Sequence, residues 1–312
     1  MESLSEQKME IKRLSTPSEQ LPDQEKIVSW IVELTGQPEA SVQSRLREEF
    51  DSPGTNVARA FRETGLEPYV WNDGLARFYE QTDAFLYELV IWNRNKLKRL
   101  MRRWVAKHLA NSEKRTLDVL SIGDGLGFDS AYLASAGHRV TYFEVPGYTE
   151  SFARKVFAEC GQDVTILTEQ SHIHLHAYDA VVCLDVLEHV PDPPAFVEVI
   201  ASYLRPGGRL IVHAPFYMIH PSNPTHLKAN RRYSGSLSLY KKYNLKLVDG
   251  EPGWNPIVLR KVGDASLARL GFTPKLLGLR LTGWYLALGR FSTLPFWWVD
   301  FYRRKRNQWF NE

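Results

Sequence analysis

The sequence predicts an α/β protein with a mostly parallel sheet and an antiparallel last strand. Residues 117–145 read as an apolar strand, a glycine turn, a short helix and a second strand, which is half of a nucleotide-binding α/β unit. Residues 178–204 repeat the order of strand and helix, and two strand-like runs follow at 245–250 and 256–261. We expect an N-terminal helical region before this core and an aromatic-rich C-terminal extension after it.

Length and composition exclude several classes of protein. A chain of 312 residues with 44% hydrophobic and 24% charged residues is typical of a globular protein with one large core or two domains. The net charge of +3 is too small to indicate a nucleic-acid partner, and none is expected. The two cysteines exclude a disulfide scaffold and a zinc–thiolate site, and they fit a reducing compartment. Because the N-terminus lacks the apolar core of a signal peptide, we expect a cytoplasmic protein.

The N-terminal third is predicted to be helical after a disordered tail over residues 1–22. Asp23 is a suitable N-cap for a first helix, which Gly36 would end. Further helices are expected over 38–50, 57–64 and 73–110, the last one broken near Asn93 to Asn95. Residues 23–112 therefore form a predicted helical region.

Two features of the helical region have more than one interpretation. Tyr79 and Tyr87 are expected to be core aromatics, and the alternative is that they reach a cofactor or an acceptor. The basic run from Lys96 to Trp104 is expected to be a solvated helix face. The alternative for this run is a site for phosphate or for an anionic surface.

Three glycines occupy alternate positions after the first predicted strand, namely Gly123, Gly125 and Gly127. A dinucleotide fingerprint would need its third glycine at Phe128, so NAD and FAD are disfavoured, and no P-loop sequence follows. Glu144 lies near the end of the second predicted strand. A carboxylate at that place can accept two hydrogen bonds from a vicinal diol.

This segment resembles motif I of the class I S-adenosylmethionine (SAM)-dependent methyltransferases, whose sheet is Rossmann-like. The resemblance implies SAM as the cofactor, with the glycine turn near its methionyl part and the acid on its ribose hydroxyls. The cofactor-binding residues that it implies here are Gly123, Asp124, Gly125, Gly127, Glu144 and Val145. Ser121 departs from the pattern, since the family often has an acid there, and no carboxylate is assigned to the SAM amino group.

A second motif, YDAVVCLDVLEHVPDP at residues 178–193, resembles that of methyltransferases of the ubiquinone-biosynthesis type. In that family the region contacts SAM and faces the acceptor, which implies that Asp185 lies beside the cofactor. Glu169 follows the third predicted strand and occupies the place of the family's adenine contact. The methyltransferase domain is expected over residues 113–262, and the extension over 263–312.

The resemblance implies methyl transfer to a small or lipid-like acceptor, and oxygen is the first choice of acceptor atom. A hydroxyl acceptor needs a base or a metal. Four histidines are candidate bases, although each taken singly is more often structural. His189, His213 and His220 lie near the carboxyl ends of the fourth and fifth predicted strands, and His226 follows them. We place His189 first among them.

A divalent metal is the alternative to a base. Asp185, Glu188 and His189 form a D-x-x-E-H arrangement similar to the E-x-x-E-H of some metal-assisted O-methyltransferases, in which a further histidine completes the site, as His226 would here. Such ligands suit Mg²⁺ or a transition metal, although many small-molecule methyltransferases use none.

Two rival functions are a nicotinamide-dependent oxidoreductase and a non-catalytic protein of the same fold that acts in binding or assembly.

The C-terminal extension is rich in Trp, Phe and Leu and carries a basic cluster from Arg303 to Arg306. Interrupting arginines and Pro295 argue against a membrane-spanning helix. We expect its aromatic residues to pack on the domain or on a second subunit of a homodimer. The alternative is a peripheral membrane contact, because tryptophan with basic residues is the composition of an interfacial segment.

Overall fold

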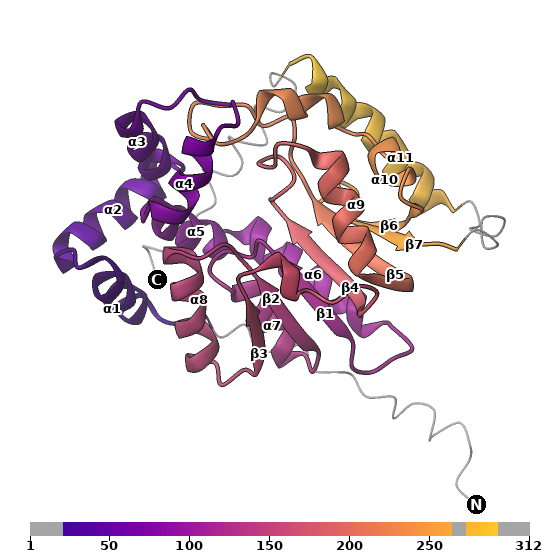
Figure 1. Ribbon diagram of the computed structural model, residues 1–312, viewed down its shortest axis with the longest axis horizontal. Coiled ribbons are helices and arrows are strands. Elements are labelled where there is room, and N and C mark those ends of the chain that lie inside the picture. The colour runs from indigo at the N-terminus through magenta and orange to yellow at the C-terminus, as the bar shows by residue number, and fades with distance from the viewer. Residues whose placement is uncertain (1–20, 264–272, 293–312) are drawn as a thin grey trace, which may run out of the picture.

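A seven-stranded sheet lies at the centre of the computed structural model, which describes residues 21–263 and 273–292 (Figure 1). The strands are β1 (Asp118–Ile122), β2 (Arg139–Phe143), β3 (Val164–Leu167), β4 (Tyr178–Leu184), β5 (Leu204–His213), β6 (Leu245–Gly250) and β7 (Ile257–Lys261). Their order is β3-β2-β1-β4-β5-β7-β6. The first five in the chain are parallel, and β7 is antiparallel to both β5 and β6. The predicted fold class is confirmed.

The central strands are apolar because both of their faces are covered. Four of the five residues of β1 and six of the seven residues of β4 are buried, as expected for inner strands of a parallel sheet. Helices α7 (Phe128–Ser135), α8 (Tyr148–Glu159) and α9 (Pro193–Tyr203) connect consecutive parallel strands. The carboxyl ends of β1, β2 and β4 therefore meet at one edge of the sheet, where ligands bind in open α/β folds.

Six helices precede the sheet in the described part of the chain: α1 (Gln24–Thr35), α2 (Glu39–Asp51), α3 (Thr55–Thr64), α4 (Asp73–Gln81), α5 (Ala84–Arg94) and α6 (Lys96–Ala110). Asp23 caps α1 through Lys26 N at 2.8 Å, and Gly36 ends it in the left-handed region, as predicted. The predicted break before α6 also occurs, where Asn95 caps the helix through Leu97 N.

A second break in the predicted 73–110 helix, at Thr82 and Asp83, was not expected. The Asp83 carboxylate forms an ion pair with Arg45 on α2 at 2.6 Å, and it also accepts a hydrogen bond from Gln37. Thr82 Oγ1 accepts from Ala84 N at 3.2 Å and so satisfies a free amide at the start of α5. These contacts turn the chain and allow α5 to approach the sheet separately from α4.

The N-terminal helices share a core with the α/β domain. Residues of α1, α2 and α5 pack in one buried cluster with Phe128 of α7 and with Phe152 and Phe157 of α8. Figure 1 shows α1 to α5 grouped on the side of the sheet where α8 lies. The packing holds α5 across the carboxyl edge of the strands.

The basic run in α6 is only partly a solvated face, so this prediction was wrong for two residues. Lys98 and Arg102 are 5% and 2% exposed. Lys98 Nζ lies 2.9 Å and Arg102 Nε 2.6 Å from the carboxylate of Asp129 in α7. Arg102 also donates to Asn93 Oδ1. The two cations are neutralised within the fold, because a buried charge needs a partner.

The described part of the C-terminal extension forms α11 (Pro274–Leu286) and a 3₁₀ turn, η4 (Ala287–Arg290). Helix α11 packs beside β6, and Leu279 is its buried residue in the main core. In the part of the chain that the structure describes, every helix is too short or too polar to cross a membrane. The predicted tail lies outside the described residues except for its last two, and so does the basic cluster from Arg303 to Arg306.

Candidate active site

The glycine turn after β1 has the backbone geometry that only glycine adopts readily. Gly123, Gly125 and Gly127 have φ values of 69°, 63° and 78°, all in the left-handed region. A Cβ on Gly123 would lie 2.4 Å from Val186 Cγ2, and one on Gly127 would lie 2.7 Å from the Phe157 ring. A residue with a side chain is therefore disfavoured at these positions, both by the backbone conformation and by the neighbouring side chains.

Glu144 follows β2 and is joined to the glycine turn. Its Oε2 accepts from Gly125 N at 2.8 Å, and its Oε1 accepts from Val145 N at 3.1 Å. Burial raises the pKa of the carboxyl to about 7, although the two amide hydrogen bonds oppose this shift. Each oxygen has a second lone pair, so the carboxylate still has acceptors for a diol. The assignment of the turn and the carboxylate to the methionyl and ribose parts of SAM stays a prediction of the sequence resemblance.

The remaining residues predicted around the cofactor have different environments. Asp124 accepts from the backbone N–H groups of Asp129 and Ser130 at 3.2 and 2.7 Å, so it caps α7. Burial raises its pKa to about 7. Val145 is 42% exposed. The Glu169 side chain is 68% exposed, and its Oε2 lies 3.8 Å from His172 Nε2; its contact with the adenine stays a prediction.

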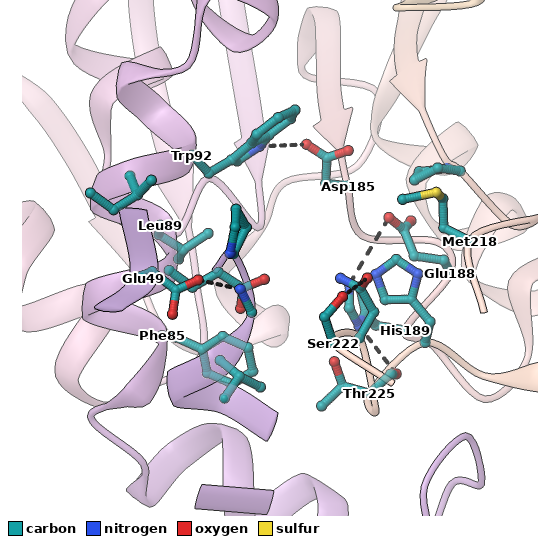
Figure 2. Close-up of a pocket in the computed structure, with 18 of the residues that line it drawn as sticks. Glu49, Phe85, Leu89, Trp92, Asp185, Glu188, His189, Met218, Ser222 and Thr225 are labelled. Atoms are coloured by element: carbon teal, nitrogen blue, oxygen red, sulfur yellow. Dashed lines mark hydrogen bonds and ion pairs between the residues drawn. The ribbon is translucent and has the colours of Figure 1, made fainter. Parts of the chain in front are cut away.

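A cavity of about 160 Å³ lies between the N-terminal helices and the loops after β4 and β5 (Figure 2). The described residues that line it come from α2, α3 and the loop between them (Glu49, Pro53, Gly54, Val57), from α5 and its end (Phe85, Glu88, Leu89, Ile91, Trp92, Asn95), from after β4 (Asp185, Glu188, His189) and from after β5 (Pro215, Met218, Ser222, Asn223, Thr225, His226). Leu89 also covers the glycine turn, because a Cβ on Gly125 would lie 2.6 Å from its Cδ1. Leu89 therefore lies against both the turn and the cavity.

Four carboxyl groups face the cavity, and none of the described residues that line it is lysine or arginine. Glu49 is fully buried and caps α3 through the backbone N–H groups of Gly54 and Asn56. Burial raises the pKa of Glu88 to about 8, and the nearby carboxylates of Glu49 and Asp185 add to the shift. Neither acid was predicted as a site residue.

Asp185 ends β4 in a strained, left-handed conformation with φ 61°. Its Oδ1 lies 2.5 Å from His213 Nδ1, and its Oδ2 accepts from the Trp92 indole N–H at 3.1 Å. Lys98 Nζ lies 3.8 Å from the same Oδ2. Both carboxylate oxygens of Asp185 therefore contact other side chains of the protein. The predicted base His213, at the end of β5, is 4% exposed and is one of these contacts.

His189 contacts both α4 and the loop after β5. Its Nδ1 lies 2.8 Å from Tyr79 Oη and 3.2 Å from the Thr225 carbonyl oxygen. Because the carbonyl can only accept, the tautomer with its proton on Nδ1 satisfies this contact and leaves a lone pair on Nε2. Burial lowers the pKa of His189 to about 4, so the ring is neutral at physiological pH.

Tyr79 and Tyr87, each of which had two interpretations, lie in different environments. Tyr79 reaches the candidate active site through its hydrogen bond to His189, although it was expected to be a core aromatic. Tyr87 is fully buried, and the Arg45 guanidinium lies 3.7 Å above its ring. Tyr87 is therefore a core aromatic, as predicted.

One group of described residues has the geometry to hold a metal ion, namely Glu188, His189 and His226. One ligand atom from each lies within 4.8 Å of the other two, and the imidazole rings of the two histidines meet edge to face at 4.6 Å between centroids. The predicted ligand Asp185 is not in this group, because its oxygens are bound by His213 and Trp92. One carboxylate and two imidazoles fit a transition metal better than Mg²⁺.

Residues 93–246 match the protein family described as "Methyltransferase domain". The chain is 35% identical over 111 residues to a ubiquinone biosynthesis O-methyltransferase of Aromatoleum aromaticum, covering 34% of this chain and 46% of that protein. It is 37% identical over 117 residues to the Xylella fastidiosa protein of the same name, covering 35% and 45%. The chain thus spans less than half the length of these curated relatives.

Among solved structures, one similar chain is the 1,6-didemethyltoxoflavin-N1-methyltransferase of Burkholderia thailandensis with bound 1,6-didemethyltoxoflavin and S-adenosylhomocysteine. The two chains are 20% identical, and the match covers 55% of this chain and 81% of that one with a TM-score of 0.42. The resemblance to methyltransferases drawn from the sequence motifs is confirmed by the family match and by the curated relatives.

Proposed function

On the premise that residues 93–246 carry a methyltransferase domain, we propose that the protein transfers the methyl group of SAM to a hydroxyl group of a small or lipid-like molecule. The observation that carries this proposal is the neutral imidazole of His189 at the cavity. It lies four residues beyond Asp185, on the turn that follows β4, at the edge of the sheet that also holds Glu144.

In this proposal the glycine turn and Glu144 bind the cofactor. The Glu144 carboxylate accepts hydrogen bonds from the ribose hydroxyls, and the glycines leave room for the methionyl chain. Leu89 then shifts away from Gly125, since its side chain covers the turn. The helix α5 lies over the reacting atoms and excludes water from them.

His189 acts as the base. Methyl transfer from a sulfonium is an in-line displacement, so the acceptor oxygen must present a lone pair along the axis of the breaking bond. Nε2 of His189 takes the hydroxyl proton as the C–O bond forms and the C–S bond breaks. Glu188 Oε1, which lies 4.0 Å from Nε2, stabilises the resulting imidazolium. Tyr79 and the Thr225 carbonyl orient the ring through Nδ1.

The proposal is tested by calorimetry with SAM and by a transfer assay. We expect wild type to bind SAM, Glu144→Ala to lose binding, and Glu198→Ala, an exposed glutamate on α9, to bind normally. Incubation with methyl-labelled SAM and a metabolite extract should label an extractable molecule, and His189→Gln should abolish this label while retaining SAM binding. Binding of NADH in place of SAM would favour the oxidoreductase, and SAM binding without any transfer would favour a non-catalytic protein.

A second candidate is metal-assisted transfer through Glu188, His189 and His226, which the ligand geometry favours. A divalent metal bound there would lower the pKa of an acceptor hydroxyl. EDTA treatment followed by addition of Mn²⁺, Zn²⁺ or Mg²⁺ distinguishes the two candidates. Activity that is lost with EDTA and restored by one of these ions supports the metal, whereas unchanged activity leaves His189 as a metal-free base.

A further inference from the structure

We propose that the outer face of α11 and η4 binds an anionic lipid surface. Five large apolar residues follow one another at spacings of four, three, four and three residues, and we call them the outer stripe: Leu277, Leu281, Trp284, Leu288 and Phe291. This spacing keeps residues on one side of a helix. All five are exposed, Trp284 by 75% and Phe291 by 84%. A stripe of exposed apolar side chains of this kind indicates an interaction site.

The outer stripe is not used in packing within the described part of the chain, because α11 is held by its opposite face. Leu279 is buried in the main core, and its carbonyl accepts from the Trp254 indole N–H at 2.7 Å. The Gly283 backbone lies so close to Gly235 that no side chain would fit between them. The helix therefore packs on the domain through Leu279 and Gly283, whereas the described aromatic residues, which were expected to pack, are exposed and form part of a second apolar face.

The turn after α11 is fixed in the same way. Arg290 Nε donates to the Ser234 carbonyl oxygen, and Arg231 Nε donates to the Gly289 carbonyl oxygen, each at 3.0 Å. These reciprocal bonds tie η4 to η2 (Lys228–Tyr233). The stripe is therefore a preformed surface, and binding to it requires no rearrangement of the domain.

Charge identifies the occupant of this surface. Residues 274–312 contain seven lysines and arginines but only two acids, so this segment carries +5 while the whole chain carries +3 and residues 1–273 sum to −2. Apolar and aromatic residues followed in the sequence by clustered cations are the composition of a segment that lies in a membrane interface. A second copy of this chain bound at the outer stripe would bring two positively charged segments together. The stripe also spans only about two heptads, which is fewer than a coiled coil needs.

The same helix also contacts the loop that lines the cavity. Leu286 packs against Tyr217 and Met218, and Met218 lines the cavity beside His189. Figure 1 shows α11 on the opposite side of the sheet from α1 and α2. A protein bound through the outer stripe would hold this wall of the cavity next to the lipid, which suits a lipid-like acceptor. The binding itself does not depend on the proposed methyl transfer.

The test is flotation of the full chain with lipid vesicles. We expect the protein to float with vesicles of phosphatidylcholine and phosphatidylglycerol at 3:1, to bind phosphatidylcholine alone at least tenfold less, and to be released by 0.5 M NaCl. The double variant W284E/F291E should lose flotation. The control L100E/L175E introduces the same charge at two exposed leucines outside the outer stripe and should float like wild type. Changing Arg303, Arg304, Lys305 and Arg306 to glutamine should weaken binding to the charged vesicles.

Two results would overturn the proposal. The first is equal flotation of wild type and W284E/F291E, or no flotation of either. The second is a dimer of wild type in sedimentation that W284E/F291E converts to a monomer, which would assign the stripe to a second copy. SAM binding by W284E/F291E, measured in parallel, shows that the variant is folded. Failure of methyl transfer would leave flotation unchanged, so the two proposals fail separately.

Discussion

The indole N–H of Trp92 donates to the carboxylate of Asp185 across 3.1 Å, and so joins the helix over the cavity to the end of β4 (Figure 2). The two residues are 93 positions apart in the chain. The bond therefore fixes α5 relative to the sheet edge at which the cofactor and the acceptor are proposed to meet. It also occupies one oxygen of Asp185, which lies outside the described group that has the geometry to hold a metal ion.

Replacing Trp92 by phenylalanine should remove this bond and keep most of the ring packing. A hydrogen bond to a charged group contributes ~1.5–3 kcal/mol, so we expect the free energy of unfolding to fall by about that amount. Urea denaturation measures the change. Trp71→Phe, at an exposed tryptophan before α4, is the control and should change stability by less than ~0.5 kcal/mol. Equal effects of the two variants would show that the bond adds nothing to stability.

The carboxylate of Asp129 should be essential for folding stability. It lies between the buried cations Lys98 and Arg102, so Asp129→Ala leaves two charges without this partner. Loss of one member of a buried ion pair costs ~3–5 kcal/mol, and we expect a loss of unfolding free energy in that range. The comparison is Asp163→Ala, at an exposed aspartate before β3.

A triple variant separates charge burial from packing around Asp129. Replacing Lys98 and Arg102 by methionine and Asp129 by leucine removes all three charges together. Because apolar replacements of a buried ion network are often neutral or stabilising, it should regain most of the lost stability. A triple variant as unstable as Asp129→Ala would contradict the assignment to charge burial.

The glycine turn and the strands were predictable because their signals are local. The alternate glycines predict the left-handed turn, and the apolar run from Tyr178 to Leu184 has the bounds of β4. The unpredicted acids of the cavity come from helices that meet the sheet only in three dimensions. Each nevertheless had a sequence signal. Glu88 is the only charged residue from Ala84 to Trp92, and Glu49 lies three residues beyond Leu46 on the apolar side of α2.

Assignments that depend on long-range geometry were less predictable. Lys98 and Arg102 belong to a basic run whose sequence is that of a solvated helix, and only the packing of α6 on α7 shows their partner. The D-x-x-E-H spacing placed Asp185 among the metal ligands. Its left-handed backbone and its contacts to His213 and Trp92 set it apart from Glu188 and His189. Spacing in a turn does not define the directions of its side chains.

Glu88 should make stability fall as the pH rises. Its pKa of about 8 in the folded protein lies above its ordinary value of 4.5. A raised pKa stabilises the fold at pH values below the ordinary pKa, and this stabilisation is lost as the pH rises from ~4.5 to ~8. Glu88→Gln carries no titrating carboxyl, so its melting temperature relative to wild type should increase by ~5 °C between pH 5 and pH 8.

Differential scanning calorimetry across this pH range measures the effect of Glu88→Gln. The control is Glu80→Gln, at an exposed glutamate of α4, whose melting temperature is compared with that of wild type at each pH. A difference between Glu88→Gln and wild type that changes with pH no more than that of the control would mean that the pKa of Glu88 is not raised in the folded protein. The acidic character assigned to the cavity would then be wrong at this residue.

Glu144 should make SAM binding depend on pH in the opposite sense. Its pKa of about 7 in the ligand-free protein means that the carboxylate, which is proposed to accept from the ribose hydroxyls, dominates above pH 7 and is lost below it. The dissociation constant should therefore be nearly constant above pH 8 and rise by up to ~100-fold between pH 7 and pH 5, since each pH unit below the pKa reduces the binding form tenfold. Calorimetric titration with SAM at each pH measures this dependence. Glu144→Gln should bind weakly at every pH and lose most of the slope, while a slope that survives in the variant would assign the titration to Asp124, whose pKa is also raised to about 7.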